Sequence, residues 1–128
     1  MKPVPDLLPL AREIYEAYAE ADLVPLFQAL DEHVVWRTHS HPCSPFRGVH
    51  VGTEAIQRYF ANMTRVDNQR FEVKSLLQAG DRVVALLDVR RVLVETGQVF
   101  EGLFVHVWRW KAGRIVEVDI YEASAEVE

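Results

Sequence analysis

The amino-acid sequence predicts a single α+β domain over residues 1–128, with helices in its first half and an antiparallel sheet in its second half. Two observations predict this class. Up to about residue 63, apolar residues recur every three or four positions, as on one face of a helix. From Phe71 onward the period becomes two, as in strands with one buried face. Helices followed by a run of strands pack as one layer over one face of a sheet.

The first half is expected to hold three helices. Residues 6–30 are helical in pattern, and Asp22 is expected to cap a short second helix that has Pro25 in its first turn. A short β-like run over 34–36 and a loop rich in Pro and Gly follow, and Thr53 is expected to cap the third helix. The apolar stripe of the first helix comprises Leu7, Leu10, Ile14, Ala17, Tyr18 and Ala21.

Four strands are expected in the second half, over residues 71–79, 82–93, 98–110 and 114–123. Val, Leu and aromatic residues dominate them, and only short segments separate them. Short loops join antiparallel neighbours, because parallel neighbours need a long crossover connection. The pattern therefore favours an antiparallel meander that curls over the helices.

The last hairpin sets the expected positions of its polar side chains. With Ala112 and Gly113 as a two-residue turn, Lys111 faces Arg114. The expected pairs further along are Trp108 with Glu117, His106 with Asp119, and Phe104 with Tyr121, all on one face. The opposite face would carry only Val105, Val107, Val116, Val118 and Ile120. A shift of one residue would separate the two sets, so the expectation depends on this register.

The face with aromatic and ionisable residues allows two interpretations. It is either an outer surface or dimer interface, or the wall of a cavity between sheet and helices. An apolar cavity with a few convergent polar groups is typical of small-molecule sites. The residue pattern alone favours neither interpretation.

Composition argues against several classes of partner. The net charge is −5 and the basic residues are scattered, which disfavours nucleic acid. No segment approaches the roughly 20 apolar residues that span a bilayer, and no signal peptide is recognisable. The single cysteine, Cys43, excludes an intramolecular disulfide and fits a reducing, cytoplasmic location. His39, His41, Cys43 and His50 lack the paired spacing of a zinc site, so no metal is expected.

Five segments in order carry a resemblance over nearly the whole chain: residues 15–36, 45–60, 80–91, 96–101 and 104–122. The chain resembles the SnoaL-like branch of the nuclear-transport-factor-2-like (NTF2-like) superfamily, which includes ketosteroid isomerases, limonene epoxide hydrolases and polyketide cyclases. The resemblance implies a cystatin-like α+β cone, in which a curved antiparallel sheet wraps round three N-terminal helices and encloses a pocket. It also implies a homodimer, a small apolar ligand, and chemistry without a cofactor or a metal.

The resemblance favours the cavity interpretation and suggests candidate residues. At the position of the isomerases' base the chain has Trp36 or Arg37, neither of which is a base. The remaining candidates are His106 and Asp119 as an acid/base pair, with Tyr121 assisting. The same pair could equally be a structural hydrogen bond. The residues expected to contact a ligand are Tyr18, Trp36, Phe46, Tyr59, Phe60, Phe104 and Trp108.

Three functions follow from these candidates. The first is a cofactor-independent cyclase or isomerase that acts on a small, largely apolar carbonyl compound. The alternatives are a non-catalytic ligand-binding protein and a dimeric assembly module with the same fold. Asp88, Arg90 and Asp119 only loosely resemble the hydrolases' Arg–Asp–Asp arrangement, and Asp88 and Arg90 are interpreted as a surface or interface ion pair.

Overall fold

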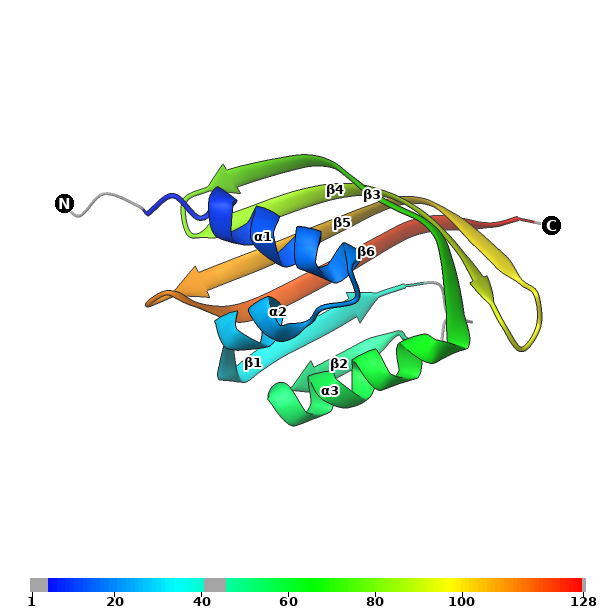
Figure 1. The fold of residues 1–128 in the computed structure, drawn as a ribbon, viewed down its shortest axis with the longest axis horizontal. Helices are drawn as coiled ribbons and strands as arrows, with labels where there is room; N and C mark the ends of the chain where they lie inside the picture. The colour runs from blue at the N-terminus through cyan, green and yellow to red at the C-terminus, as the bar shows by residue number, and fades with distance from the viewer. Residues whose placement is uncertain (1–4, 41–45, 128) are drawn as a thin grey trace.

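A computed structural model describes residues 5–40 and 46–127. Six strands form one curved open sheet in the order β2-β1-β6-β5-β4-β3, and the helices lie on its concave side (Figure 1). His41 and Cys43 lie outside the described residues. Along the chain the elements are α1 (Leu8–Ala19), α2 (Val24–Ala29), β1 (Leu30–His39), β2 (Gly48–Val51), α3 (Thr53–Ala61), the 3₁₀ helix η1 (Asn62–Arg65), β3 (Val66–Ala79), β4 (Arg82–Leu93), β5 (Val99–Lys111) and β6 (Arg114–Val127).

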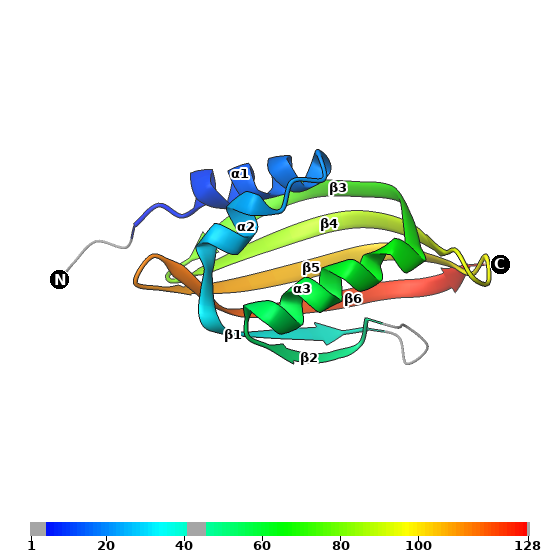
Figure 2. The same ribbon diagram turned by 60° about the horizontal axis from the view of Figure 1, so that its bottom comes forward.

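Figure 2 shows the three helices on one side of the sheet from a second direction. The core is formed by side chains of these helices and of the sheet face that they cover. Ala11 and Ile14 of α1 and Ile56 of α3 are buried against the sheet. In β4 every second residue is buried, with Val83 and Leu87 among those that face the helices. The predicted α+β class and the expected order of helices and strands are confirmed.

The sheet differs from the prediction in one pair of strands. β1 runs parallel to β6, with Trp36 opposite Val118 and Thr38 opposite Ile120. β2, in the segment expected to be a loop, pairs antiparallel with β1 at the edge of the sheet. A prediction from loop lengths could not find the parallel pair, because its two strands are distant in sequence and no short turn joins them.

The helix starts agree only in part with the sequence. Pro25 occupies the first turn of α2, as expected, but the N-cap residue is Leu23 and not Asp22. Asp22 lies one residue earlier, and its Oδ1 accepts a hydrogen bond from Val24 N–H at 2.9 Å. Thr53 is the first residue of α3 and not its cap; Gly52 precedes the helix with φ 85°. The chain turns from β2 into α3 there, and this left-handed φ favours glycine.

The β5–β6 hairpin contains the predicted turn and an unpredicted register. Ala112 and Gly113 have φ values of 52° and 77°, as in a type I′ turn, and Lys111 faces Arg114. Two pairs further on the register shifts, because Trp110 lies opposite Ile115 and Arg109 lies opposite Glu117. Val116 therefore has no residue opposite it and forms a β-bulge.

This bulge overturns the predicted pairing of His106 with Asp119. His106 lies opposite Ile120, and Val107 lies opposite Asp119. Residues with odd numbers after the bulge, including Asp119 and Tyr121, take the convex face, whereas His106 is buried on the concave face. The expected aliphatic stripe is wrong for the same reason, because Val118 and Ile120 are buried in the core.

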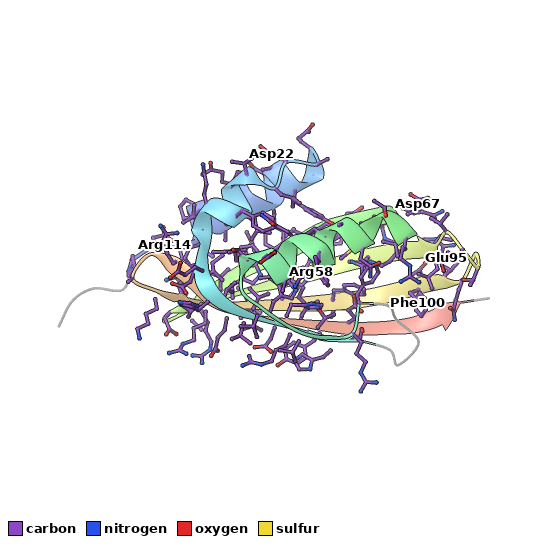
Figure 3. All side chains as sticks on the ribbon, turned by 90° about the horizontal axis from the view of Figure 1, so that it is seen from below. Asp22, Arg58, Asp67, Glu95, Phe100 and Arg114 are labelled. Carbon is purple, nitrogen blue, oxygen red and sulfur yellow. The ribbon has the colours of Figure 1, made fainter. Side chains whose placement is uncertain are left out.

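Arg114 ties the hairpin to the helical layer (Figure 3). Its Nη1 donates to the carbonyl oxygens of Gln28 at 3.2 Å and Leu30 at 3.4 Å. Carbonyls at the end of a helix have no partner within the helix, so this contact satisfies the end of α2. It also holds the start of β6 beside the start of β1, the strand with which β6 pairs.

We expect opposite effects from two substitutions in the turn. The left-handed φ of Ala112 is unfavourable for alanine because its Cβ crowds the backbone, and asparagine tolerates this φ better. Ala112→Asn should therefore raise the free energy of unfolding by about 0.5–1 kcal/mol. Gly113→Ala should lower it by about 1 kcal/mol, because alanine tolerates that φ poorly. Urea unfolding of the two variants and the parent measures both changes, and a loss of stability in Ala112→Asn would contradict the assigned turn.

Candidate functional site

A cavity lies between the helices and the concave face of the sheet. The cavity has a volume of about 50 Å³. All of the empty space between its lining atoms, including the part that opens to solvent, is about 500 Å³. Its walls are mainly apolar and aromatic, with one imidazole and one guanidinium. The lining residues are Ile14, Tyr15, Tyr18, Leu26, Trp36, Tyr59, Phe60, Met63, Phe71, Arg91, His106, Trp108 and Ile120.

Most of the predicted ligand-contacting side chains line this cavity. They are Tyr18, Trp36, Tyr59, Phe60 and Trp108. Phe46 and Phe104 are buried but do not line it; their rings lie 5.9 Å and 4.8 Å from the guanidinium carbon of Arg91. These two residues support the cavity wall through Arg91. Contact of any of the seven with a ligand stays a prediction.

His106 in the cavity wall is hydrogen-bonded to Tyr15, which α1 places above β5. The hydroxyl of Tyr15 lies 2.7 Å from His106 Nδ1, and the Tyr15 ring stacks on Trp108 with 4.9 Å between centroids. Burial raises the pKa of Tyr15 well above its usual value. Burial, together with the nearby charge of Arg91, lowers the pKa of His106 to about 3. Both groups are therefore neutral near pH 7.

Neutrality determines what His106 can offer a ligand. We assign the proton of this hydrogen bond to the hydroxyl of Tyr15. The Tyr15 O–H then donates to His106 Nδ1, and one hydrogen bond gives both buried groups a partner. The imidazole then carries its own proton on Nε2. His106 lines the cavity, and no described residue is its partner at Nε2, so this N–H remains as a hydrogen-bond donor.

Asp119 and Tyr121 belong to a different cluster, on the convex face. Asp119 Oδ1 lies 3.1 Å from His39 Nε2, and its Oδ2 lies 3.4 Å from Arg37 Nη1. Tyr121 stacks on His39 at 4.6 Å with 44% of its surface exposed. The predicted acid/base pair is not formed, because the bulge at Val116 places its two members on opposite faces of the sheet.

A buried ion pair lies where the sequence analysis did not expect one. Arg91 Nη1 donates to Glu122 Oε1 at 2.9 Å, and the two side chains are 8% and 5% exposed. Arg91 Nε donates to Asn68 Oδ1 at 3.2 Å. Burial raises the pKa of Glu122, and Arg91 opposes that rise. Arg91 is the charged member of this pair that lines the cavity.

The sequence does contain a signal for Arg91. It continues the alternation of buried residues in β4, in phase with Leu87 and Val89, whereas Asp88 and Arg90 are out of phase. Asp88 Oδ1 accepts a hydrogen bond from Arg70 Nη2 at 3.1 Å, and Arg90 forms an ion pair with Glu101. Both contacts lie on the convex face. Asp88 and Arg90 are thus surface ion-pair residues, each with a partner on a neighbouring strand.

Two lining tryptophans carry buried donors. The indole Nε1 atoms of Trp36 and Trp108 are buried and have no hydrogen-bond partner within the described part of the chain. A buried donor without an acceptor costs about 1–3 kcal/mol, so each N–H favours a water or ligand oxygen beside it. The residues that line the cavity thus carry hydrogen-bond donors as well as apolar surface.

The histidines of the loop region do not converge. His39 contacts Asp119, whereas His50 packs on the Tyr59 ring at 5.1 Å. Across residues 5–40 and 46–127, no three His, Cys, Asp or Glu side chains are grouped as a metal site would require. No helix in these ranges is long and apolar enough to cross a membrane.

Comparisons with known proteins agree with this fold. The family model of the SnoaL-like domain matches residues 11–118. An NTF2-like protein of unknown function from Burkholderia pseudomallei is 26% identical, with a TM-score of 0.76. The alignment covers 88% of this chain and 87% of that one. A comparison with curated proteins found no match.

Two further solved structures share the fold at lower identity. A putative SnoaL-like polyketide cyclase from Mesorhizobium loti is 16% identical, with a TM-score of 0.76 and coverage of 91% of this chain and 99% of that one. A putative isomerase from Rhodopseudomonas palustris is 15% identical, with a TM-score of 0.67 and coverage of 90% and 87%.

The low pKa of His106 makes stability depend on pH. Between pH 6.5 and about 3 the unfolded chain binds a proton at His106 that the folded chain does not, so stability falls as the pH falls through this window. From pH 8 to pH 5 we expect the parent to lose about 2 kcal/mol more than His106→Gln. Urea unfolding at both pH values measures the loss. Equal losses in the two proteins would show that His106 is not held neutral.

Proposed function

The chain belongs to the SnoaL-like domain family, and we propose that its cavity binds a small, largely apolar carbonyl compound and stabilises the enolate of that compound. The observation that carries the proposal is the buried hydrogen bond from Tyr15 to His106 in the cavity wall. It fixes a neutral imidazole whose Nε2–H can donate to a carbonyl oxygen. When hydroxide from solvent takes a proton from the carbon next to the carbonyl and forms water, negative charge develops on the carbonyl oxygen, which strengthens the hydrogen bond.

Stabilisation of an enolate fits a His106 that stays neutral. An imidazole with a pKa of about 3 is a poor proton acceptor near pH 7, so the acid/base role expected for His106 is replaced by that of an electrophilic donor. Tyr15 keeps the ring orientation and tautomer fixed. The apolar wall lowers the local dielectric constant and strengthens the bond to a developing oxyanion.

Enolate formation would serve either an isomerase or a cyclase that needs no cofactor. An isomerase returns the proton to a different carbon, and an aldol cyclase joins the enolate carbon to a second carbonyl. The names of the Rhodopseudomonas and Mesorhizobium structures include these two activities, which supports the proposal by analogy of fold.

A second candidate function, a non-catalytic carrier of the same kind of ligand, is favoured by one observation. Among the described lining residues none is Asp or Glu, so the wall presents no carboxylate as a general base. A carrier needs only the shape and the donors of the cavity. The two candidates differ in whether the protein accelerates loss of the proton.

The homodimer stays a proposal. Its expected surface is the convex face, where Leu103 and Tyr121 are exposed and Val105 and Val107 are half-buried. This surface also carries the ion pairs of Asp88, so it is less apolar than the sequence suggested.

A panel of small ketones that includes acetophenone tests the function. Binding is followed by the fluorescence of the lining tryptophans, and enolate formation by exchange of the ketone's α-hydrogens for deuterium in heavy water. We expect binding and accelerated exchange with the parent. His106→Gln should slow the exchange about 100-fold, the typical effect of losing one oxyanion donor.

Asp119→Asn is the matched control, because its side chain lies on the convex face. We expect binding and exchange equal to those of the parent. Binding without exchange would support the carrier, and exchange that survives in His106→Gln would remove His106 from the mechanism.

A further inference from the structure

We infer that the cavity takes its ligand as an oxygen anion on an apolar body, such as an enolate, a phenolate or an aromatic carboxylate, and that Arg91 selects this charge. The inference rests on the proposed function, because it concerns the same cavity. It adds a ligand class and a specificity-determining residue to that function.

The charges of the lining residues point to an anion. Among the described residues of the wall, Arg91 is the one charged side chain. The polar groups beside it are the neutral His106, three tyrosines and the donor-only indoles of Trp36 and Trp108. A wall with one cation, several donors and no described carboxylate favours an acceptor with negative charge over a neutral or cationic ligand.

The pairing of Arg91 with Glu122 does not remove this preference. Arg91 lines the cavity, whereas Glu122 lines a separate groove with Arg37 and Arg47, beside β1 and β2. The ion pair thus forms part of the wall between two spaces, with its cation toward the cavity and its anion toward the groove. A ligand in the cavity therefore meets the guanidinium.

The neighbouring titratable groups respond to Arg91 even though Glu122 is present. Burial lowers the pKa of His106, and Arg91 lowers it further. Burial raises the pKa values of Tyr18 and Tyr59; Arg91 acts against that rise in both, and in Tyr59 its effect is larger than the opposite effect of Glu122. All three effects have the sign of a positive charge that acts on the cavity.

Arg91 is also held in place before a ligand arrives. Glu122 and Asn68 accept hydrogen bonds from its Nη1 and Nε, and the rings of Phe104 and Phe46 lie against its guanidinium. A long side chain that is already ordered loses little conformational entropy on binding. The cation is therefore a preorganised partner for an oxygen anion.

Two probes of nearly the same shape test the inference. Benzoate and acetophenone each carry one phenyl ring and one small carbonyl substituent, and only benzoate is charged near pH 7. We expect the parent to bind benzoate more tightly than acetophenone, by tryptophan fluorescence or calorimetry. Glu122→Gln keeps the shape of the side chain and removes the charge that opposes Arg91, so benzoate affinity should rise about tenfold, with acetophenone affinity changed less than about twofold.

Removal of the cation should have the reverse effect. Arg91→Met combined with Glu122→Leu replaces the buried ion pair by apolar side chains and leaves no unpaired buried charge. Benzoate affinity should fall about tenfold or more, and acetophenone binding should remain. Arg90→Met is the matched control, because Arg90 adjoins Arg91 in sequence but pairs with Glu101 on the convex face. It should leave the affinity for both probes unchanged.

The outcomes separate the two proposals. If neither probe binds, the proposed function fails and this inference fails with it. If acetophenone binds but benzoate binds no more tightly, or if Glu122→Gln leaves benzoate affinity unchanged, Arg91 does not select the ligand and the proposed function stands. Thermal unfolding reports whether each variant is folded. Glu122→Gln leaves Arg91 without its partner charge, so if that variant is not folded, the double variant and the preference of the parent for benzoate over acetophenone decide the matter.

Discussion

The β-bulge at Val116 decides which side chains of β6 face the cavity. Side chains alternate between the two faces of a strand, so one unopposed residue reverses the facing of every residue after it. With the bulge, Val118 and Ile120 complete the core and Asp119 lies with Arg37 and His39 outside. Without it, a carboxylate would face α1 and two aliphatic side chains would face solvent, at a cost of several kcal/mol.

The polar groups of the cavity wall either carry a charge that is paired with an opposite charge or carry no charge. A buried charge is tolerated only with a partner, and Arg91 and Glu122 supply one for each other. His106 avoids the cost of a buried charge by staying neutral, and its Nδ1 accepts a hydrogen bond from the Tyr15 hydroxyl. The indole N–H groups of Trp36 and Trp108 are the exceptions, since no described residue accepts a hydrogen bond from either of them. An unsatisfied donor at a binding site is one that a bound molecule can satisfy.

Local patterns predicted the features that depend on neighbouring residues. The strand alternation and the left-handed turn at Ala112 and Gly113 were predicted from the sequence, and the family resemblance supplied the curvature of the sheet. The expected stripe of the first helix was right only in part, because Leu10 and Ala21 are exposed, whereas Ala11 and Tyr15 are buried and were not in it. The bulge at Val116 was not readable, because no glycine or proline marks it and its cause lies in tertiary packing. His106 was chosen through its expected pairing with Asp119, which does not form, although His106 does line the cavity. Arg91 could have been found from the alternation of buried residues in β4, whereas its pairing with Glu122 across β5 could not.

The parallel contact between β1 and β6 also bears on how quickly the molecule reaches its native state. Arg37 and Asp119, which meet across this contact, are 82 positions apart. The entropy of closing so large a loop opposes the contact until other strands have already formed. Proteins rich in such distant pairings fold slowly, on the order of milliseconds to seconds. Ile120 of β6 lines the cavity beside residues from the first half of the chain, so the cavity is completed late, after the last strand has been synthesised and has paired with β1.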